Sequence, residues 1–215
     1  MEYITSDWHF GHRNMCGPDS FLETRKHFKD VSEMNKHLIT VHNETVNQEK
    51  DVTIHLGDIC LGLKPKEVFE ILKQMKGHFI FVKGNHDDSK LIKYLKNNNY
   101  RLGDGRDKFL GFEEVGIRRK SNGIVYYLTH YPLGLGQTRR NMRNICGHIH
   151  ELPAREANVL NVGIDSPERP KTECFGAPIL LEDAFNQLHQ KHLNWFDAQE
   201  EATKQLFYQD RPELS

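Results

Sequence analysis

Five times along this chain, an apolar segment of strand character ends in a short polar turn that carries Asp, His or Asn. The turns are Asp7-Trp8-His9, Gly57-Asp58, Gly84-Asn85-His86-Asp87, Thr129-His130-Tyr131 and Gly147-His148-Ile149-His150. Residues two apart on an extended segment point the same way, so the paired side chains of the first and last turns can face one ion or two neighbouring ions. Carboxylate, amide and imidazole groups form a fairly hard ligand set, which suits Mn, Fe, Zn or Mg.

The first half of the chain alternates strands with helices. Strands are predicted over residues 2–6, 52–56 and 79–82, and helices over residues 31–46, from Pro65 to just before Gly77, and over residues 89–96. Asp30 and Ser32 are both candidates for the N-cap of the first helix, and Pro65 suits a first helical position. Polar loops after the strands of such an alternation are typical of a layered α/β domain with sites at the strand ends.

Short strands dominate the second half. Residues 109–118 and 124–129 predict a hairpin around Ser121-Asn122-Gly123, and further strands are predicted over residues 144–146, 159–162 and 177–181. We expect these strands to form a second sheet. The fold class expected from the whole pattern is therefore α/β, with two packed, mixed β-sheets flanked by helices.

Size and composition indicate one globular domain. With 215 residues and a hydrophobic fraction of 37%, the chain can bury one substantial core. Lys and Arg number 29 against 30 Asp and Glu, so no global field marks a duplex nucleic acid or an anionic membrane as partner. The sequence contains no leader-like or membrane-spanning stretch, and its four cysteines lack the spacing of metal or redox motifs. We expect a cytoplasmic protein with reduced thiols.

The ordered turns resemble the calcineurin-like metallophosphoesterase superfamily, whose signature is D-x-H, G-D, G-N-H-[DE], H and G-H-x-H. The resemblance covers about residues 1–181, and the stretches TSDWHFGH, HLGD, GNHD, HYP, GHIH and NVGID are similar to small bacterial and phage members. It implies a four-layer αββα sandwich over residues 1–181. Residues 182–215 then form a C-terminal helical extension, packed on or extending from the same domain.

The resemblance also implies a dinuclear metal centre. Carried over residue by residue, the first metal is held by Asp7, His9 and His150, and the second by Asn85, His130 and His148. Asp58 bridges the two. Mn²⁺ is the favoured cofactor, with Fe, Zn, Ni and Mg as alternatives. By the same resemblance, a hydroxide shared by the metals attacks phosphorus, and His86 with Asp58 forms the catalytic pair, His86 acting as the acid and base.

One departure from the family pattern bears on the substrate. Members that cleave phosphoproteins carry an arginine after the G-D motif and another after G-N-H, and this chain has none at either place. A guanidinium there would clamp the extra charge of a monoester dianion. The sequence therefore favours a phosphodiesterase over a phosphoprotein phosphatase, acting on a nucleotide or another small phosphate ester. Nuclease or phosphatase activity on nucleic-acid ends is an alternative, although no nucleic-acid module is recognisable.

Three residues outside the signature are candidates for substrate contact. His12 lies three residues after His9 in the same loop, and Arg139 and Arg140 lie between two turns that carry ligands. The competing interpretation of the two arginines is a solvated basic loop. His55 and Asp165 are candidates for orienting a ligand, with core packing and a turn cap as their alternatives. A further alternative for the whole chain is a binding scaffold without catalysis, although such a scaffold would lack some ligands or His86. The oligomeric state is left open.

Overall fold

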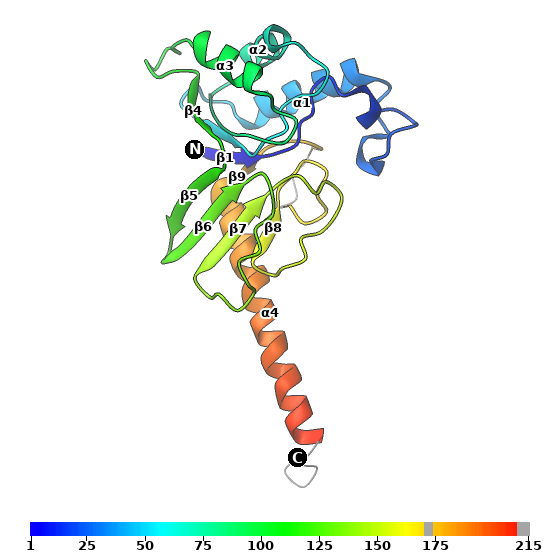
Figure 1. The fold of residues 1–215 in the computed structure, drawn as a ribbon, viewed down its shortest axis with the longest axis vertical. Coiled ribbons are helices and arrows are strands. Elements are labelled where there is room, and N and C mark those ends of the chain that lie inside the picture. Colours follow the sequence, from blue (N-terminus) through cyan, green and yellow to red (C-terminus); the bar gives the residue numbers. More distant parts are fainter. Residues whose placement is uncertain (170–173, 210–215) are drawn as a thin grey trace.

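Two β-sheets lie against each other in the computed structural model, which describes residues 1–169 and 174–209 (Figure 1). The first sheet has the order β4-β3-β2-β1-β9 and is parallel except for β9, which runs antiparallel to β1. Its strands are β1 (Glu2–Thr5), β2 (Val52–His55), β3 (His78–Val82), β4 (Phe109–Glu113) and β9 (Ile179–Leu180). The second sheet has the order β5-β6-β7-β8. Its strands are β5 (Gly116–Ser121), β6 (Ile124–Thr129), β7 (Met142–Cys146) and β8 (Val159–Asn161). This confirms the expected α/β class with two mixed sheets and helices.

Three helices cover the first sheet on the side away from the second. They are α1 (Val31–Thr45), α2 (Pro65–Gln74) and α3 (Ser89–Asn97), and two short 3₁₀ helices, η1 (Arg13–Met15) and η2 (Glu23–Arg25), precede α1. Asp30 is the N-cap of α1, since its carboxylate accepts hydrogen bonds from the backbone N–H groups of Ser32 and Glu33. Pro65 stands at the first position of α2, as its fixed φ favours.

The apolar core has two parts, because alternate residues of each strand face opposite sides of the sheet. Phe79 and Phe81 of β3 are buried among the residues under α1, α2 and α3. Ile54 of β2 and Val82 of β3 are instead buried against residues of the second sheet, such as Leu128. A strand buried on both faces agrees with the almost wholly apolar run that predicted β3.

Two strands of the first sheet differ from the prediction. The segment expected as one strand over residues 109–118 is divided into β4 and β5, and only β5 pairs with β6 as a hairpin. β4 pairs instead with β3. Likewise, the strand expected over residues 177–181 is the short β9, which pairs with β1 and not with the second sheet. Backbone pairing partners decide sheet membership, and a local hydrophobic pattern does not encode them.

The last helix, α4 (Leu181–Gln209), begins directly after β9 and contacts β1, β7, β8 and β9. Its first turns bury Ala184, Phe185 and Leu188, and the ring of Phe185 stacks on Tyr126 with centroids 4.0 Å apart. Farther along, α4 runs away from the sheets (Figure 1). The division of the chain at residue 181 stays a prediction, and residues 210–215 lie outside the described residues.

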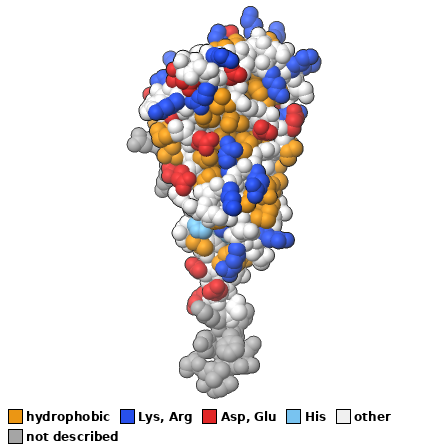
Figure 2. Space-filling view, turned by 90° about the vertical axis from the view of Figure 1, so that its left-hand side faces the viewer, with side chains coloured by type: hydrophobic (Ala, Val, Ile, Leu, Met, Phe, Trp, Pro, Cys, Tyr) orange, Lys and Arg blue, Asp and Glu red, His pale blue; other side chains and the backbone are white. Residues whose placement is uncertain are grey.

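Charge is spread over the surface beside β4 and β5. Figure 2 shows that face, where Lys and Arg side chains are interspersed with acidic and apolar ones. This mixture agrees with the formal net charge of -1. Among the residues that the structure describes, no helix combines the length and apolar character needed to cross a membrane.

Candidate metal centre

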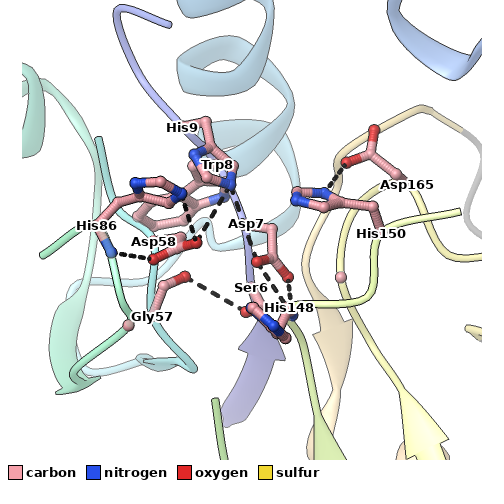
Figure 3. A network of polar contacts seen from close by, with 12 residues as sticks. Ser6, Asp7, Trp8, His9, Gly57, Asp58, His86, His148, His150 and Asp165 are labelled. Atoms are coloured by element: carbon pink, nitrogen blue, oxygen red, sulfur yellow. Dashed lines mark hydrogen bonds and ion pairs between the residues drawn. The ribbon is translucent and has the colours of Figure 1, made fainter. Parts of the chain in front are cut away.

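The five polar turns meet at one place, beyond the carboxyl ends of β1, β2, β3, β6 and β7. There the side chains form two groups, each with ligand atoms within 4.8 Å of one another: Asp7 with His9 and His150, and Asp58 with His130 and His148. Strands from both sheets contribute. Each group combines residues that follow strands of the first sheet with residues that follow strands of the second, and Figure 3 shows Asp7, Asp58, His148 and His150 close together at this place.

The backbone at these side chains is unusual. Six non-glycine residues of the described chain have a positive φ, and five of them are candidate ligands: Asp7 (63°), His9 (51°), Asp58 (59°), His148 (70°) and His150 (46°). The left-handed conformation is unfavourable for residues with a Cβ atom, and it is held only where the surrounding structure determines it. It turns the chain sharply off each strand end and directs the side chain into the shared space.

Two glycines permit the close approach of the turns. A Cβ atom on Gly84 would lie 2.2 Å from Asp58 Oδ1. A Cβ atom on Gly147 would lie 2.0 Å from Ser6 Oγ and 2.4 Å from Asp7 Oδ2. All three distances are far shorter than a van der Waals contact, so the motifs need glycine at these positions.

His9 is the most informative member of the first group. Its ring is fully buried, and neither ring nitrogen has a hydrogen-bond partner. Burial, with the nearby Arg25 charge, lowers the pKa of His9, so the imidazole is neutral and offers a lone pair. Burial raises the pKa of the adjacent Asp7 carboxyl to about 7. A buried imidazole without a partner beside two carboxylates fits a divalent cation, because such polar groups otherwise cost free energy.

His130 leads to the same conclusion for the second group. Its Nδ1 donates to the carbonyl oxygen of Leu56 at 2.8 Å, which leaves the lone pair on Nε2. That Nε2 lies 2.8 Å from Asn85 Oδ1 and 3.5 Å from Asp58 Oδ2. Burial lowers the pKa of His130, so no second proton is expected on the ring. Three lone-pair atoms thus converge without a proton between them, which a cation would stabilise.

Asp58 stands between the two groups. Its Oδ2 lies 3.5 Å from His9 Nε2 and 3.5 Å from His130 Nε2. Its other oxygen, Oδ1, accepts a hydrogen bond from the backbone N–H of His86 at 2.9 Å. The side chain of His86 is 38% exposed, and its Nε2 lies 4.0 Å from Asp58 Oδ2. His86 is thus beside the group while facing solvent (Figure 3).

Two residues support the centre in roles that the sequence analysis did not assign to them. The Asp87 carboxylate accepts hydrogen bonds from the backbone N–H groups of Asp58, Ile59 and Gly84. The Arg25 guanidinium pairs with Asp165, whose Oδ2 lies 3.2 Å from His150 Nδ1. Asp165 therefore orients a ligand, which was one of its two alternatives. Asp87 is the last residue of the G-N-H-[DE] motif, which could have pointed to it. Arg25 bonds to backbone carbonyls of the first motif, and such a contact leaves no spacing signal in a sequence.

The predicted substrate contacts have different outcomes. The His12 ring lies 5.7 Å from that of His9, at the edge of the centre, and burial lowers its pKa. Arg139 and Arg140 are exposed and precede β7, whereas the candidate ligands follow the end of that strand. The Arg140 guanidinium lies over the Phe196 ring of α4, 4.4 Å from its centroid. The structure therefore does not bring these two arginines to the centre. His55 is buried against Trp8, with ring centroids 4.1 Å apart, which agrees with its core-packing alternative.

Comparison with known proteins agrees with the geometry. Residues 3–177 match the family model described as the calcineurin-like phosphoesterase superfamily domain. The chain belongs to this superfamily. A calcineurin-like phosphoesterase is metal-dependent, and the two groups of Asp and His described above are its candidate metal sites.

Two proteins are similar to this chain, and neither name states an activity. An uncharacterized protein of Methanocaldococcus jannaschii is 35% identical over 102 residues, which is 46% of this chain and 54% of that protein. The chain thus matches about half the length of this relative. A crystal structure of a protein of unknown function from Aquifex aeolicus is also similar, with a TM-score of 0.52 and 22% identity. The similarity covers 77% of this chain and 90% of the Aquifex chain. At that identity the likeness concerns the fold alone.

Proposed function

We propose that this calcineurin-like protein is a dinuclear metal-dependent phosphodiesterase that hydrolyses a phosphate ester of a nucleotide or another small molecule. The observation that carries the proposal is the pair of buried imidazoles, since His9 has no hydrogen-bond partner and His130 directs its Nε2 at Asn85 and Asp58. Asp7, His9 and His150 would hold one divalent cation, and Asn85, His130 and His148 the other, with Asp58 shared. Mn²⁺ is the ion we favour, because the carboxylate and amide oxygens of the set suit it, and Fe, Zn, Ni and Mg are the alternatives.

The bound cations would supply Lewis-acid chemistry, because they neutralise phosphate charge and make a water molecule nucleophilic near neutral pH. The chain itself supplies the proton transfer. His86 faces solvent at the edge of the centre, where a leaving group could reach its ring, and its backbone N–H is fixed by Asp58. In this proposal His86 donates a proton to the leaving oxygen, and such general acid catalysis contributes roughly 10²–10⁴-fold to a rate.

The preference for a diester is supported by the hydrogen bonds that occupy the guanidinium of Arg25. It is the arginine whose charge acts on both His9 and His12, and its guanidinium is committed to Asp165 and to backbone carbonyls. A committed guanidinium cannot clamp a phosphate dianion. This supports a monoanionic diester as substrate over a monoester.

An exposed ring beside the centre supports a substrate with an aromatic group. Tyr131 is 49% exposed, and its ring centroid lies 4.6 Å from that of His148. A planar base could stack on this surface while the phosphate lies at the metals. The alternatives are a nuclease or phosphatase acting on nucleic-acid ends and a binding scaffold without catalysis, and the assays below distinguish them.

The test is a metal-reloading assay. Metal-stripped protein is loaded separately with Mn, Mg, Zn, Ni or Fe and assayed on bis-p-nitrophenyl phosphate, p-nitrophenyl phosphate and a 2',3'-cyclic nucleotide. We expect metal-dependent turnover of the diesters, falling about 10²–10⁴-fold in His86→Ala. His27→Ala, at an exposed histidine of the loop before α1, is the control and should retain full activity.

Three results would contradict the proposal. Faster turnover of the monoester would contradict the diester preference, and steep loss of affinity with rising salt would favour a nucleic-acid substrate. If no metal supports turnover of any substrate, so that the wild type and His86→Ala do not differ, the binding scaffold would be favoured.

A further inference from the structure

We propose that Arg25 is a positioning residue that holds Asp7, His9 and His150 in their ligand geometry, so that its loss weakens one metal site and spares the other. The inference rests on the proposed function in one respect, since it takes these three side chains to form a metal site. Arg25 itself touches neither group of ligand atoms. It acts through the backbone of the first turn and through Asp165.

The guanidinium of Arg25 is fully buried, and each of its nitrogens is engaged. Nε and Nη2 donate to the two oxygens of the Asp165 carboxylate, at 2.8 and 2.6 Å. Nη2 also donates to the carbonyl oxygen of Asp7 at 2.6 Å. Nη1 donates to the carbonyl oxygen of Trp8 at 3.0 Å and lies 3.7 Å from Met34 Sδ. The planar fork of an arginine is thus used in full.

The first path from Arg25 to the metal site runs through the backbone. The two carbonyls that it binds belong to Asp7 and Trp8, inside the turn in which Asp7 and His9 both have a positive φ. That conformation is unfavourable for residues with a Cβ atom, so it needs fixed partners. Hydrogen bonds to both carbonyls from one rigid, buried group restrain the turn at that point.

The second path runs through Asp165. Its Oδ2 accepts a hydrogen bond from His150 Nδ1 at 3.2 Å, while both of its oxygens are held by Arg25. A proton on Nδ1 leaves the lone pair of His150 on Nε2, the nitrogen free to bind an ion. The same carboxylate accepts a hydrogen bond from Thr24 Oγ1 at 2.7 Å, so η2 is held against the segment after β8 that carries Asp165.

The second group of ligands also has supports that do not involve Arg25. Two contacts link it to the first turn, since the backbone N–H of His148 donates to the Asp7 carboxylate and that of His9 donates to the carbonyl oxygen of Asp58 at 3.0 Å. His130 is held by the carbonyl oxygen of Leu56, and the turn of Asp58 by the carboxylate of Asp87. None of the hydrogen bonds of Arg25 reaches these residues. We therefore expect a change at Arg25 to act on the site of Asp7, His9 and His150.

The experiment measures how many Mn²⁺ ions variants of the full chain bind, and with what affinity. Arg25→Lys keeps the charge but loses the fork, and Arg25→Met loses both. Arg143 is the matched control, because it is also buried, and its Nη1 donates to the carbonyls of Arg140 and Met142 at the far end of β7. Arg143→Lys and Arg143→Met therefore test the effect of changing a buried arginine away from the centre. Each protein is titrated with Mn²⁺ by calorimetry, followed by elemental analysis and by electron paramagnetic resonance.

We expect two Mn²⁺ ions in the wild-type protein and in the Arg143 variants. In both Arg25 variants one site should keep its affinity, and the other should weaken by about 10–100-fold, the usual effect of losing an orienting partner. The resonance signal of an adjacent Mn pair should give way to that of isolated ions. A general loss of stability would not produce this selective change.

The inference is overturned if the Arg25 variants bind two ions with the affinities of the wild type, or if both of their sites weaken equally. If Arg25→Met fails to fold, Arg25→Lys decides by the same titration. A wild-type protein that binds no Mn²⁺ would overturn this inference and the proposed metal centre together. A wild-type protein that binds two ions but hydrolyses no ester would overturn the proposed function alone.

Discussion

The carboxylate of Asp87 accepts a hydrogen bond from the backbone N–H of Asp58 at 2.8 Å. It also accepts hydrogen bonds from the backbone N–H groups of Ile59 and Gly84, and so it links the turn after β2 to the turn after β3. We predict that Asp87→Asn lowers both stability and diesterase activity, because its amide would set an N–H₂ group against backbone donors. Each unsatisfied buried donor costs about 1–3 kcal/mol.

Urea unfolding and steady-state kinetics measure the two effects of Asp87→Asn. Asp88→Asn is the matched control, since Asp88 caps α3 and asparagine is an equally good N-cap. Equal behaviour of the two variants would contradict the role assigned to Asp87.

Gly147 gives a second prediction. A methyl group there would lie 2.4 Å from Asp7 Oδ2, so Gly147→Ala should displace Asp7 and reduce metal binding as well as activity. Gly134→Ala is the control, because the nearest atom to its added carbon is Glu156 Oε1 at 3.8 Å. Metal content by elemental analysis and the melting temperature check both variants. Full metal loading of Gly147→Ala would show that the turn can shift without harm.

His42 gives a prediction of pH dependence away from the metal centre. Burial lowers its pKa from the ordinary value of 6.5 to about 3, and its Nε2 lies 3.0 Å from Thr53 Oγ1. The unfolded chain therefore binds a proton between these two pKa values that the folded chain does not. Stability contributed by neutral His42 is present above pH 6.5 and is lost as the pH falls toward 3.

Between pH 7 and pH 5 this loss amounts to about 2 kcal/mol. We predict that His42→Gln loses less stability over this interval than the wild type does. Urea unfolding at the two pH values measures the difference. An identical loss in both proteins would mean that His42 titrates normally in the folded chain.

Arg140 allows the original hypothesis of a substrate clamp to be checked. Since its guanidinium lies over Phe196 of α4, Arg140→Ala should leave KM for the diester unchanged and cost about 0.5–1 kcal/mol of stability. Arg139→Ala should likewise leave KM unchanged, because that exposed side chain also precedes β7. Initial-rate kinetics and thermal unfolding test the pair. A several-fold rise in KM for either variant would restore the clamp.

Much of the centre could be predicted from sequence because its chemistry is local. Asp7 and Asp58 follow the parallel strands β1 and β2, and His148 follows β7 of the second sheet, each within three residues of the strand end. The carboxyl ends of parallel strands share one edge of a sheet. Their convergence follows from that geometry. The supporting residues could not be predicted in this way. Arg25 reaches the first turn from a separate 3₁₀ helix, and its partners there are carbonyl oxygens, which every residue has.

The errors have a physical cause as well. Arg139 and Arg140 lie between His130 and His148 in sequence, which suggested that they lie between them in space. However, β6 and β7 are parallel, so the chain must return to the opposite end of the sheet before β7 begins. The strand β9, which was expected in the second sheet, is only two residues long, and so it offers little pattern from which its pairing with β1 could be predicted.

The left-handed backbone of the five candidate ligand residues affects which substitutions would stabilise this protein. Each strained residue costs about 1 kcal/mol or more that asparagine or glycine would largely recover. A collection of variants screened for heat resistance alone would therefore be expected to accumulate substitutions at positions such as His148, with loss of metal binding. A screen that requires turnover would exclude them. At these five positions the geometry of the candidate centre and the intrinsic preferences of the backbone oppose each other.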